Sequence, residues 1–146
     1  MKRIIPILLA VVLLSASTAI SFAADNTSNS KVIVYYFHGN FRCSSCWAIE
    51  RYTKEVLNNN FKKRLDSGQL VIKVVNVEKE GNTHFVQDYQ LYTKSVVLSL
   101  VKDGKEVKFK NLDKVWQYLR NKNEFYEYIK EETQSFLDVL KAGDEL

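Results

Sequence analysis

Two runs of apolar, largely β-branched residues flank an amphipathic stretch in the first half of the chain. Segments 31–37 (KVIVYYF) and 70–77 (LVIKVVNV) are apolar almost throughout, which predicts strands that are buried on both faces. From Ser44 onward, apolar residues recur at three- and four-residue spacing, which predicts a helix with one buried face. A strand, a helix and a second strand in this order predict a right-handed βαβ unit.

The second half of the chain carries a hairpin signal. Segment 95–101 (SVVLSLV) predicts a third buried strand, and segment 106–110 a fourth. Asp103 and Gly104 between them are typical of a tight turn, so these last two strands should be antiparallel.

Three further helices complete the predicted elements. Segment 81–92 has a weak helical pattern, and Asn111 and Asn123 are candidate N-caps of two closing helices. With the two closing helices written as one final α, the predicted order is β-α-β-α-β-β-α, an α/β arrangement with a mixed central sheet and helices free to cover both faces.

Residues 1–23 have the composition of a secretory signal. Lys2 and Arg3 precede an apolar stretch at 4–14, and the sequence SFA at 21–23 offers small residues where a signal peptidase cuts. We expect an exported protein, periplasmic or extracellular, with no membrane association after cleavage. An uncleaved N-terminal anchor is the alternative.

The chain beyond the signal is expected to form a single domain. Residues 24–30 are polar and are expected to form a disordered leader, and residues 31–142 are long enough for one core. The formal net charge of +4 falls to about +2 without Lys2 and Arg3. No basic stripe with interleaved aromatic residues is present, so we expect no nucleic-acid partner.

The two cysteines of the chain, Cys43 and Cys46, form a Cys-x-x-Cys pair where the first strand gives way to the first helix. A helix that begins at Cys43 aims its free first-turn amides at the Cys43 sulfur, and Arg42 adds a positive charge next to it. Both effects favour a thiolate. Cys46 lies one helical turn away, where it can resolve a mixed disulfide on Cys43.

Three other roles for the pair fit the residues less well. A structural disulfide across so short a loop stabilises by only about 2 kcal/mol. A closed zinc site needs four ligands, and beyond the pair only His38 and His84 offer nitrogen. Attachment of a haem needs histidine at position 47, which is Trp47. Redox chemistry is the leading interpretation, and we expect neither a metal nor another cofactor.

The element order, the Cys-x-x-Cys pair at the first strand-to-helix junction and the late Asp-Gly hairpin resemble the thioredoxin fold. More narrowly, YYFHGNFRCSSCWAIE, YTKSVVL and KNLDKVWQYL are similar to a family of small exported thioredoxin-like proteins, often labelled nitrophenyl-compound nitroreductase subunits. The resemblance implies a three-layer sandwich around a mixed sheet.

The chain departs from the thioredoxin pattern in two places. The position of the cis-proline that faces the cysteines falls on Val96, after Ser95, so we expect a trans peptide there. The substrate groove implied by the resemblance would then be lined by Trp47, Ser95 and Val96 in a different shape. The buried acid and lysine of the family fall on Phe37 and Val74, and both are lost.

These losses leave proton transfer at Cys46 without an obvious base. His38 ends the first strand at the same junction, and an imidazole titrates near neutral pH, so His38 is a candidate catalytic residue. The alternative is a loop histidine bonded to backbone. Glu50, one turn beyond Cys46, is expected to be surface charge, and His84 to be solvated.

The leading functional hypothesis is an extracytoplasmic thiol-disulfide oxidoreductase acting on protein thiols or disulfides. Cys43 would attack and Cys46 resolve, and an upstream redox partner would recycle the pair. Two alternatives remain open: a non-catalytic thioredoxin-fold subunit of a larger redox complex, and a dithiol that binds arsenite or a soft metal.

Overall fold

The computed structural model describes residues 30–143. The predicted signal peptide and nearly all of the predicted leader lie outside the described residues. No helix within 30–143 is long and apolar enough to cross a membrane.

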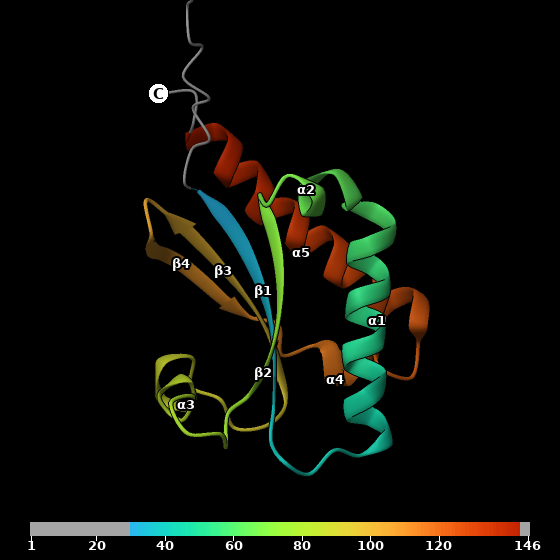
Figure 1. The fold of residues 1–146 in the computed structure, drawn as a ribbon. Coiled ribbons are helices and arrows are strands. Elements are labelled where there is room, and N and C mark those ends of the chain that lie inside the picture. Colours follow the sequence, from blue (N-terminus) through green and yellow to red (C-terminus); the bar gives the residue numbers. More distant parts are fainter. Residues whose placement is uncertain (1–29, 144–146) are drawn as a thin grey trace, which may run out of the picture.

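The described residues form a four-stranded mixed sheet with strand order β2-β1-β3-β4 (Figure 1). The central strand β1 pairs parallel to β2 and antiparallel to β3, and β4 pairs antiparallel to β3. The strands are β1 (Lys31–His38), β2 (Leu70–Asn76), β3 (Ser95–Lys102) and β4 (Lys105–Asn111). The predicted mixed sheet and the antiparallel final hairpin are confirmed.

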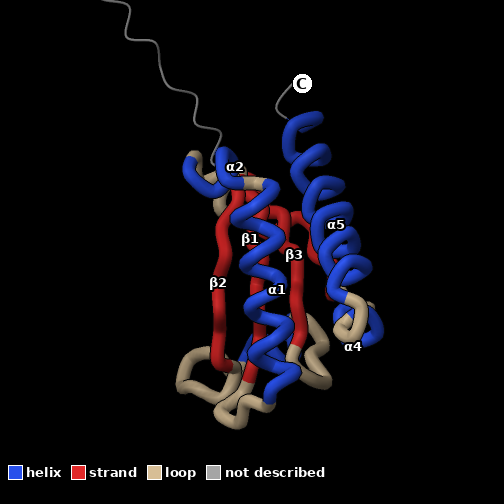
Figure 2. The backbone as a smooth tube through the Cα atoms, turned by 90° about the vertical axis from the view of Figure 1, so that its right-hand side faces the viewer, coloured by secondary structure: helices blue, strands red, loops and turns tan. Residues whose placement is uncertain are grey.

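Helices cover both faces of this sheet, but unequally. The helices are α1 (Ser44–Asn60), α2 (Lys62–Asp66), α3 (His84–Asp88), α4 (Val115–Tyr118) and α5 (Lys122–Gly143). Helices α1 and α5 lie side by side on one face, and the short α3 lies on the other (Figures 1 and 2). The fold is thioredoxin-like, as expected from the element order.

The sheet separates two hydrophobic cores, and β1 contributes to both because successive side chains of a strand point to opposite faces. Val32, Val34 and Tyr36 belong to the main core, which α1 and α5 cover. Ile33, Tyr35 and Phe37 belong to the smaller core with Tyr89 after α3. The alternation along β1 therefore decides which side chains face the helix that carries the cysteines.

Strand β2 is less buried than predicted. The apolar run predicts cover on both faces, but β2 is an edge strand with Lys73 and Val74 exposed. An edge strand has a neighbour on one side alone, and β2 lies at the edge of the sheet beside α1, away from α5 (Figure 2).

Local turn and cap signals were partly correct. Asp103 and Gly104 have positive φ of 50° and 77°, as a type I′ hairpin turn requires. The N-cap predicted at Asn123 is wrong, because the Asn121 side chain accepts the Glu124 amide and α5 begins at Lys122. The N-cap predicted at Asn111 is also wrong, because Asn111 ends β4.

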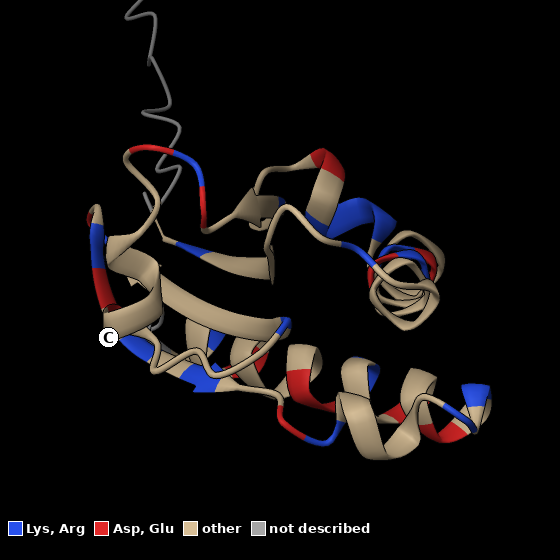
Figure 3. Cartoon of the chain, turned by 90° about the horizontal axis from the view of Figure 1, so that it is seen from below, with Lys and Arg blue, Asp and Glu red and all other residues tan. Residues whose placement is uncertain are grey.

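Charged residues of both signs mix along α1 and α5 (Figure 3). Several of them pair within a helix, and Lys122 of α5 pairs with Glu55 of α1. An exposed ion pair thus joins α1 to α5 on their outer side, and apolar side chains pack between the two helices and the sheet.

Candidate functional site

The two cysteines lie at the N-terminus of α1, at the lower end of the fold in Figure 1. Cys43 is the N-cap residue with extended backbone, and Cys46 is in the first turn. Cys43 is partly exposed and Cys46 is fully buried. Both are free thiols, and their sulfurs are 2.6 Å apart. Because a disulfide joins sulfurs at about 2.05 Å, oxidation of the pair requires little movement.

The backbone at the helix start gives each sulfur an amide donor. The Cys46 amide donates to Cys43 Sγ, and the Cys43 amide donates to Cys46 Sγ at 3.2 Å. This is the reciprocal geometry of a capping box, here made by two sulfurs. The Cys46 thiol and then the amides of the first turn lower the pKa of Cys43 below its ordinary value. Cys43, the sulfur predicted to attack, is therefore the more exposed of the two, and its pKa is lowered.

Arg42 is turned along the helix toward Glu50. The two side chains form an ion pair, and each is only 13% exposed. The guanidinium carbon also lies 3.5 Å from the centroid of the Trp47 ring, a cation–π contact. Burial opposes the Arg42 charge, but the hydrogen bond and charge of Glu50 outweigh it and raise the Arg42 pKa. Whether Arg42 also lowers the Cys43 pKa stays a prediction.

Glu50 was expected to be simple surface charge, and this expectation is wrong. Its carboxylate is held between Arg42 and Lys54, whose Nζ lies 2.5 Å from Oε1. Burial raises the pKa of Glu50, but the hydrogen bonds and charges of Lys54 and Arg42 lower it further, so the net pKa is below the ordinary value. Glu50 is thus an ionised group that holds Arg42 over Trp47.

The residue beneath the second cysteine is Tyr36, which sequence reasoning missed. Its hydroxyl donates to the Cys46 carbonyl oxygen at 2.7 Å in a buried environment. The resemblance places the family's buried acid at Phe37, but Phe37 points to the opposite core. Val74 pairs with Tyr36 in the β1–β2 register, not with Phe37. Tyr36, and not Phe37, is therefore the β1 side chain that contacts Cys46.

His38 lies at the end of β1 with its ring 5.9 Å from that of Tyr36. Its Nδ1 donates to the Gly39 carbonyl at 2.8 Å, so it is bonded to backbone. This matches the alternative considered for a loop histidine. Its use as a base for Cys46 stays a prediction.

The predicted groove residues differ in exposure. Trp47 is 53% exposed beside the cysteines, while Val96 is completely buried in the main core. Val96 pairs with Tyr36 across the β1–β3 register, which places the start of β3 next to the site. Its side chain does not line a groove, which corrects that expectation. The peptide before Val96 is trans, as expected.

Ser95 borders a small cavity at the start of β3. The cavity, of about 210 Å³, lies between the loop before β3 and the start of α4, with Tyr92 and Trp116 among its walls. The Trp116 indole donates to the Lys94 carbonyl at 2.9 Å, which joins the two segments. Neither cysteine nor Trp47 lines this cavity, so the role of Ser95 in a substrate groove stays a prediction.

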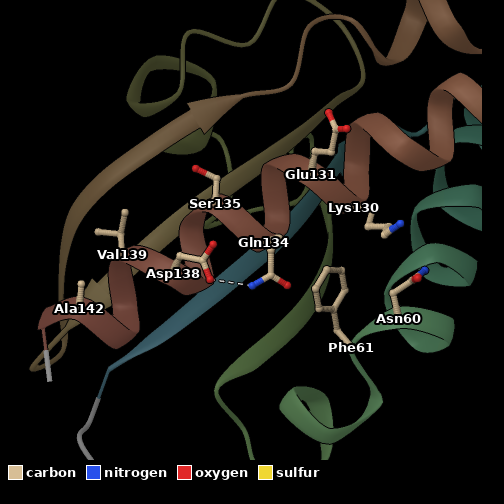
Figure 4. Close-up of a pocket in the computed structure, with 9 residues that line it drawn as sticks. All are labelled: Asn60, Phe61, Lys130, Glu131, Gln134, Ser135, Asp138, Val139 and Ala142. Atoms are coloured by element: carbon tan, nitrogen blue, oxygen red, sulfur yellow. Dashed lines mark hydrogen bonds between the residues drawn. The ribbon is translucent and has the colours of Figure 1, made fainter. Parts of the chain in front are cut away.

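A larger groove lies far from the cysteines. It has a volume of about 720 Å³ and runs between α5 and the end of α1, with Phe61 and Gln134 among its walls (Figure 4). Asn60 and Ser44 are at opposite ends of α1, about 25 Å apart at the usual rise of a helix. The groove is therefore separate from the chemistry of the pair.

His84 is placed away from the cysteines, as expected for a solvated residue. It is exposed at the start of α3 and bonds to Asp88 through Nδ1 at 2.7 Å. Within residues 30–143, no three side chains of His, Cys, Asp or Glu are grouped so that they would hold a metal ion.

Among the comparisons with known proteins, only the comparison with solved structures found similar chains. No protein-family model matches the chain, and no curated protein matches its sequence. The chain is similar to thioredoxin O2 from Arabidopsis thaliana in the oxidized state, with 16% identity over 66% of this chain and 76% of that one and a TM-score of 0.40.

Two other solved structures show similarity of the same order. A mutant thioredoxin from Entamoeba histolytica is 20% identical over 71% of this chain and 84% of its own, with a TM-score of 0.40. A structure described as a malarial protein is 17% identical over 69% of this chain and 96% of its own, with a TM-score of 0.42. The fold assignment rests on the strand order and directions described above.

The different environments of the two sulfurs predict selective alkylation. In the native reduced protein, iodoacetamide should modify Cys43 at least about tenfold faster than Cys46, because thiolate character and access decide the rate. The pH midpoint for Cys43 should lie below about 8.5, the ordinary thiol value. Mass spectrometry of peptides after timed labelling gives both rates.

The control is the same labelling in guanidinium chloride, where the unfolded chain should show equal rates. Equal rates in the native protein would contradict the placement of Cys46 in the buried first turn.

Proposed function

We propose that this protein is a thiol-disulfide oxidoreductase that acts outside the cytoplasm on protein disulfides or thiols. One observation carries the proposal: a partly exposed sulfur with a lowered pKa at a helix N-terminus, with a second, buried sulfur 2.6 Å away. This is the arrangement that thiol-disulfide exchange needs.

The extracytoplasmic location has separate support. Residues 1–23 have the composition of a secretory signal, and the chain resembles a family of small exported thioredoxin-like proteins. Outside the reducing cytosol a vicinal pair is oxidised unless a partner reduces it. The proposal therefore includes an upstream partner with a thiol or disulfide that recycles Cys43 and Cys46.

In the reducing direction the chemistry proceeds in two exchanges. The Cys43 thiolate attacks one sulfur of a substrate disulfide, forms a mixed disulfide and releases the other substrate sulfur as a thiolate. Cys46 then loses its proton and attacks Cys43 Sγ, which forms the Cys43–Cys46 disulfide and releases the second substrate thiolate. Two electrons pass from the pair to the substrate, whose two thiolates take up protons.

The test is turnover together with a reduction potential. The protein should catalyse the reduction of insulin by dithiothreitol above the level given by protein alkylated at Cys43. Equilibration with glutathione should give a potential between about −270 and −120 mV, the range of redox-active pairs.

The potential also gives the direction of the reaction, since values near −270 mV mark a reductant and values near −120 mV an oxidant. A potential below about −300 mV with no turnover would indicate a structural disulfide and would contradict the proposal. Equilibration with glutathione but no turnover of insulin would instead favour a subunit that passes electrons within a complex.

A further inference from the structure

Tyr36 is a polar side chain that β1 presents to the helix of the cysteines. Its neighbours Tyr35 and Phe37 point to the opposite core, where they stack on each other with ring centroids 5.1 Å apart. Tyr36 is 1% exposed and lies in the main core beneath α1. Its hydroxyl donates to the Cys46 carbonyl at 2.7 Å, across ten residues of sequence.

The environment of Tyr36 keeps this donor protonated. Burial, above all, raises its pKa to about 12, although the nearby Arg42 guanidinium acts against the shift. The guanidinium carbon lies 5.6 Å from the Tyr36 ring centroid. A phenol with this pKa remains a hydrogen-bond donor throughout the neutral range, and it does not serve as a base.

The bond joins the first turn of α1 to the central strand of the sheet. The carbonyl that accepts it belongs to Cys46, whose sulfur is 2.6 Å from Cys43 Sγ and 3.2 Å from the Cys43 amide. Fixing the Cys46 backbone fixes the direction from which its sulfur approaches Cys43. Such alignment of two reacting groups lowers the barrier of an intramolecular step.

We propose that Tyr36 is a positioning residue for the resolving thiol, holding Cys46 Sγ in line to attack the mixed disulfide on Cys43. The proposal rests on the proposed function and concerns its second exchange. In that step the Cys46–Cys43 sulfur bond forms, the bond from Cys43 to the substrate sulfur breaks, and the substrate leaves as a thiolate. Tyr36 gives up no proton; it sets the geometry.

The experiment compares Tyr36→Phe with wild type and with the matched control Tyr35→Phe. Tyr35 neighbours Tyr36 on β1 but faces the other core, so its variant removes a hydroxyl that is remote from Cys46. Each reduced protein is mixed with glutathione disulfide, quenched with acid at timed intervals and analysed by mass spectrometry. Attack by Cys43 is measured as formation of the glutathione adduct. Resolution by Cys46 is measured as loss of that adduct and formation of the Cys43–Cys46 disulfide.

We expect Tyr36→Phe to attack at the wild-type rate and to resolve about fivefold more slowly, the effect of losing one ordinary hydrogen bond. The fraction oxidised at a fixed glutathione ratio should fall correspondingly, by about fivefold in the equilibrium constant or about 20 mV. Tyr35→Phe should match wild type in both measurements. A loss of general stability would not produce a change confined to resolution and to the potential.

The attack rate serves as an internal standard, because it requires a folded helix start in the same molecule. Resolution in Tyr36→Phe as fast as in Tyr35→Phe would overturn the inference and leave the proposed function intact. Slow resolution in Tyr35→Phe to the same degree would also overturn it. An absence of any adduct or disulfide in wild type would instead overturn the proposed function.

Discussion

Replacing Cys46 by serine should trap protein substrates as stable mixed disulfides on Cys43, while replacing Cys43 by serine should trap none. Turnover of insulin should fall at least about a thousandfold in both variants, because the two-step exchange needs both sulfurs and each variant lacks one of them. The two variants should differ in trapping because Cys43 is partly exposed to a substrate and Cys46 is buried. Non-reducing electrophoresis of periplasmic or secreted extracts measures the trapping.

The matched control is Ser45→Ala, which changes a residue between the two cysteines and keeps both sulfurs. It should turn over and should not accumulate mixed disulfides. Trapping by Cys43→Ser in place of Cys46→Ser would reverse the assignment of the attacking and resolving sulfurs.

The second large effect is expected from Glu50→Gln, which should destabilise the protein by about 2–3 kcal/mol at neutral pH. The change leaves the Arg42 guanidinium largely buried without its charged partner, and breaking a buried ion pair from one side is costly. The Arg42 Nε already has no hydrogen-bond partner among the described residues. A glutamine oxygen can still accept a hydrogen bond from the guanidinium, but it supplies no negative charge. Urea unfolding followed by circular dichroism gives the free energy of unfolding.

The pH dependence of this effect has a defined sign. The pKa of Glu50 is lowered in the folded protein, so its ionised form contributes stability above the pKa of an unfolded glutamate, about 4.3. That contribution is lost as pH falls through the lower, folded pKa. The difference between wild type and Glu50→Gln should therefore be constant above about pH 5 and shrink below about pH 4.

Asp66→Asn is the control, because Asp66 pairs with Lys62 on an exposed surface. It should change the free energy of unfolding by less than about 1 kcal/mol. A Glu50→Gln variant as stable as Asp66→Asn, or a difference that persists unchanged to about pH 3, would contradict the buried ion pair.

Local signals in the sequence were enough to predict where most elements lie and where the cysteine pair lies on them. The Cys-x-x-Cys pair was expected at a helix start, and α1 does begin at Ser44 with Cys43 as its cap. Asp103-Gly104 predicted the final hairpin, because both residues tolerate positive φ. These features depend on neighbours within a few residues, which the sequence shows directly.

Other features of the site depend on contacts that local sequence signals do not show. The ion pair between Arg42 and Glu50 spans a helix end and a turn, and it forms because the helix start turns Arg42 along α1. From the sequence alone, Glu50 is predicted to be one of several charged residues on the solvent-facing side of α1. The sequence does not indicate that the two charges are largely buried together.

The sequence by itself determined the set of elements, their order and the position of the two sulfurs. The tertiary structure decided which face of β1 meets those sulfurs, and so made Tyr36, rather than Phe37, the neighbour of Cys46. The reason is that β1 is apolar on both faces, so its sequence does not indicate which face packs against the helix of the cysteines. Packing of α1 against one face, and of α3 against the other, settles the choice and brings the Tyr36 hydroxyl to the Cys46 carbonyl.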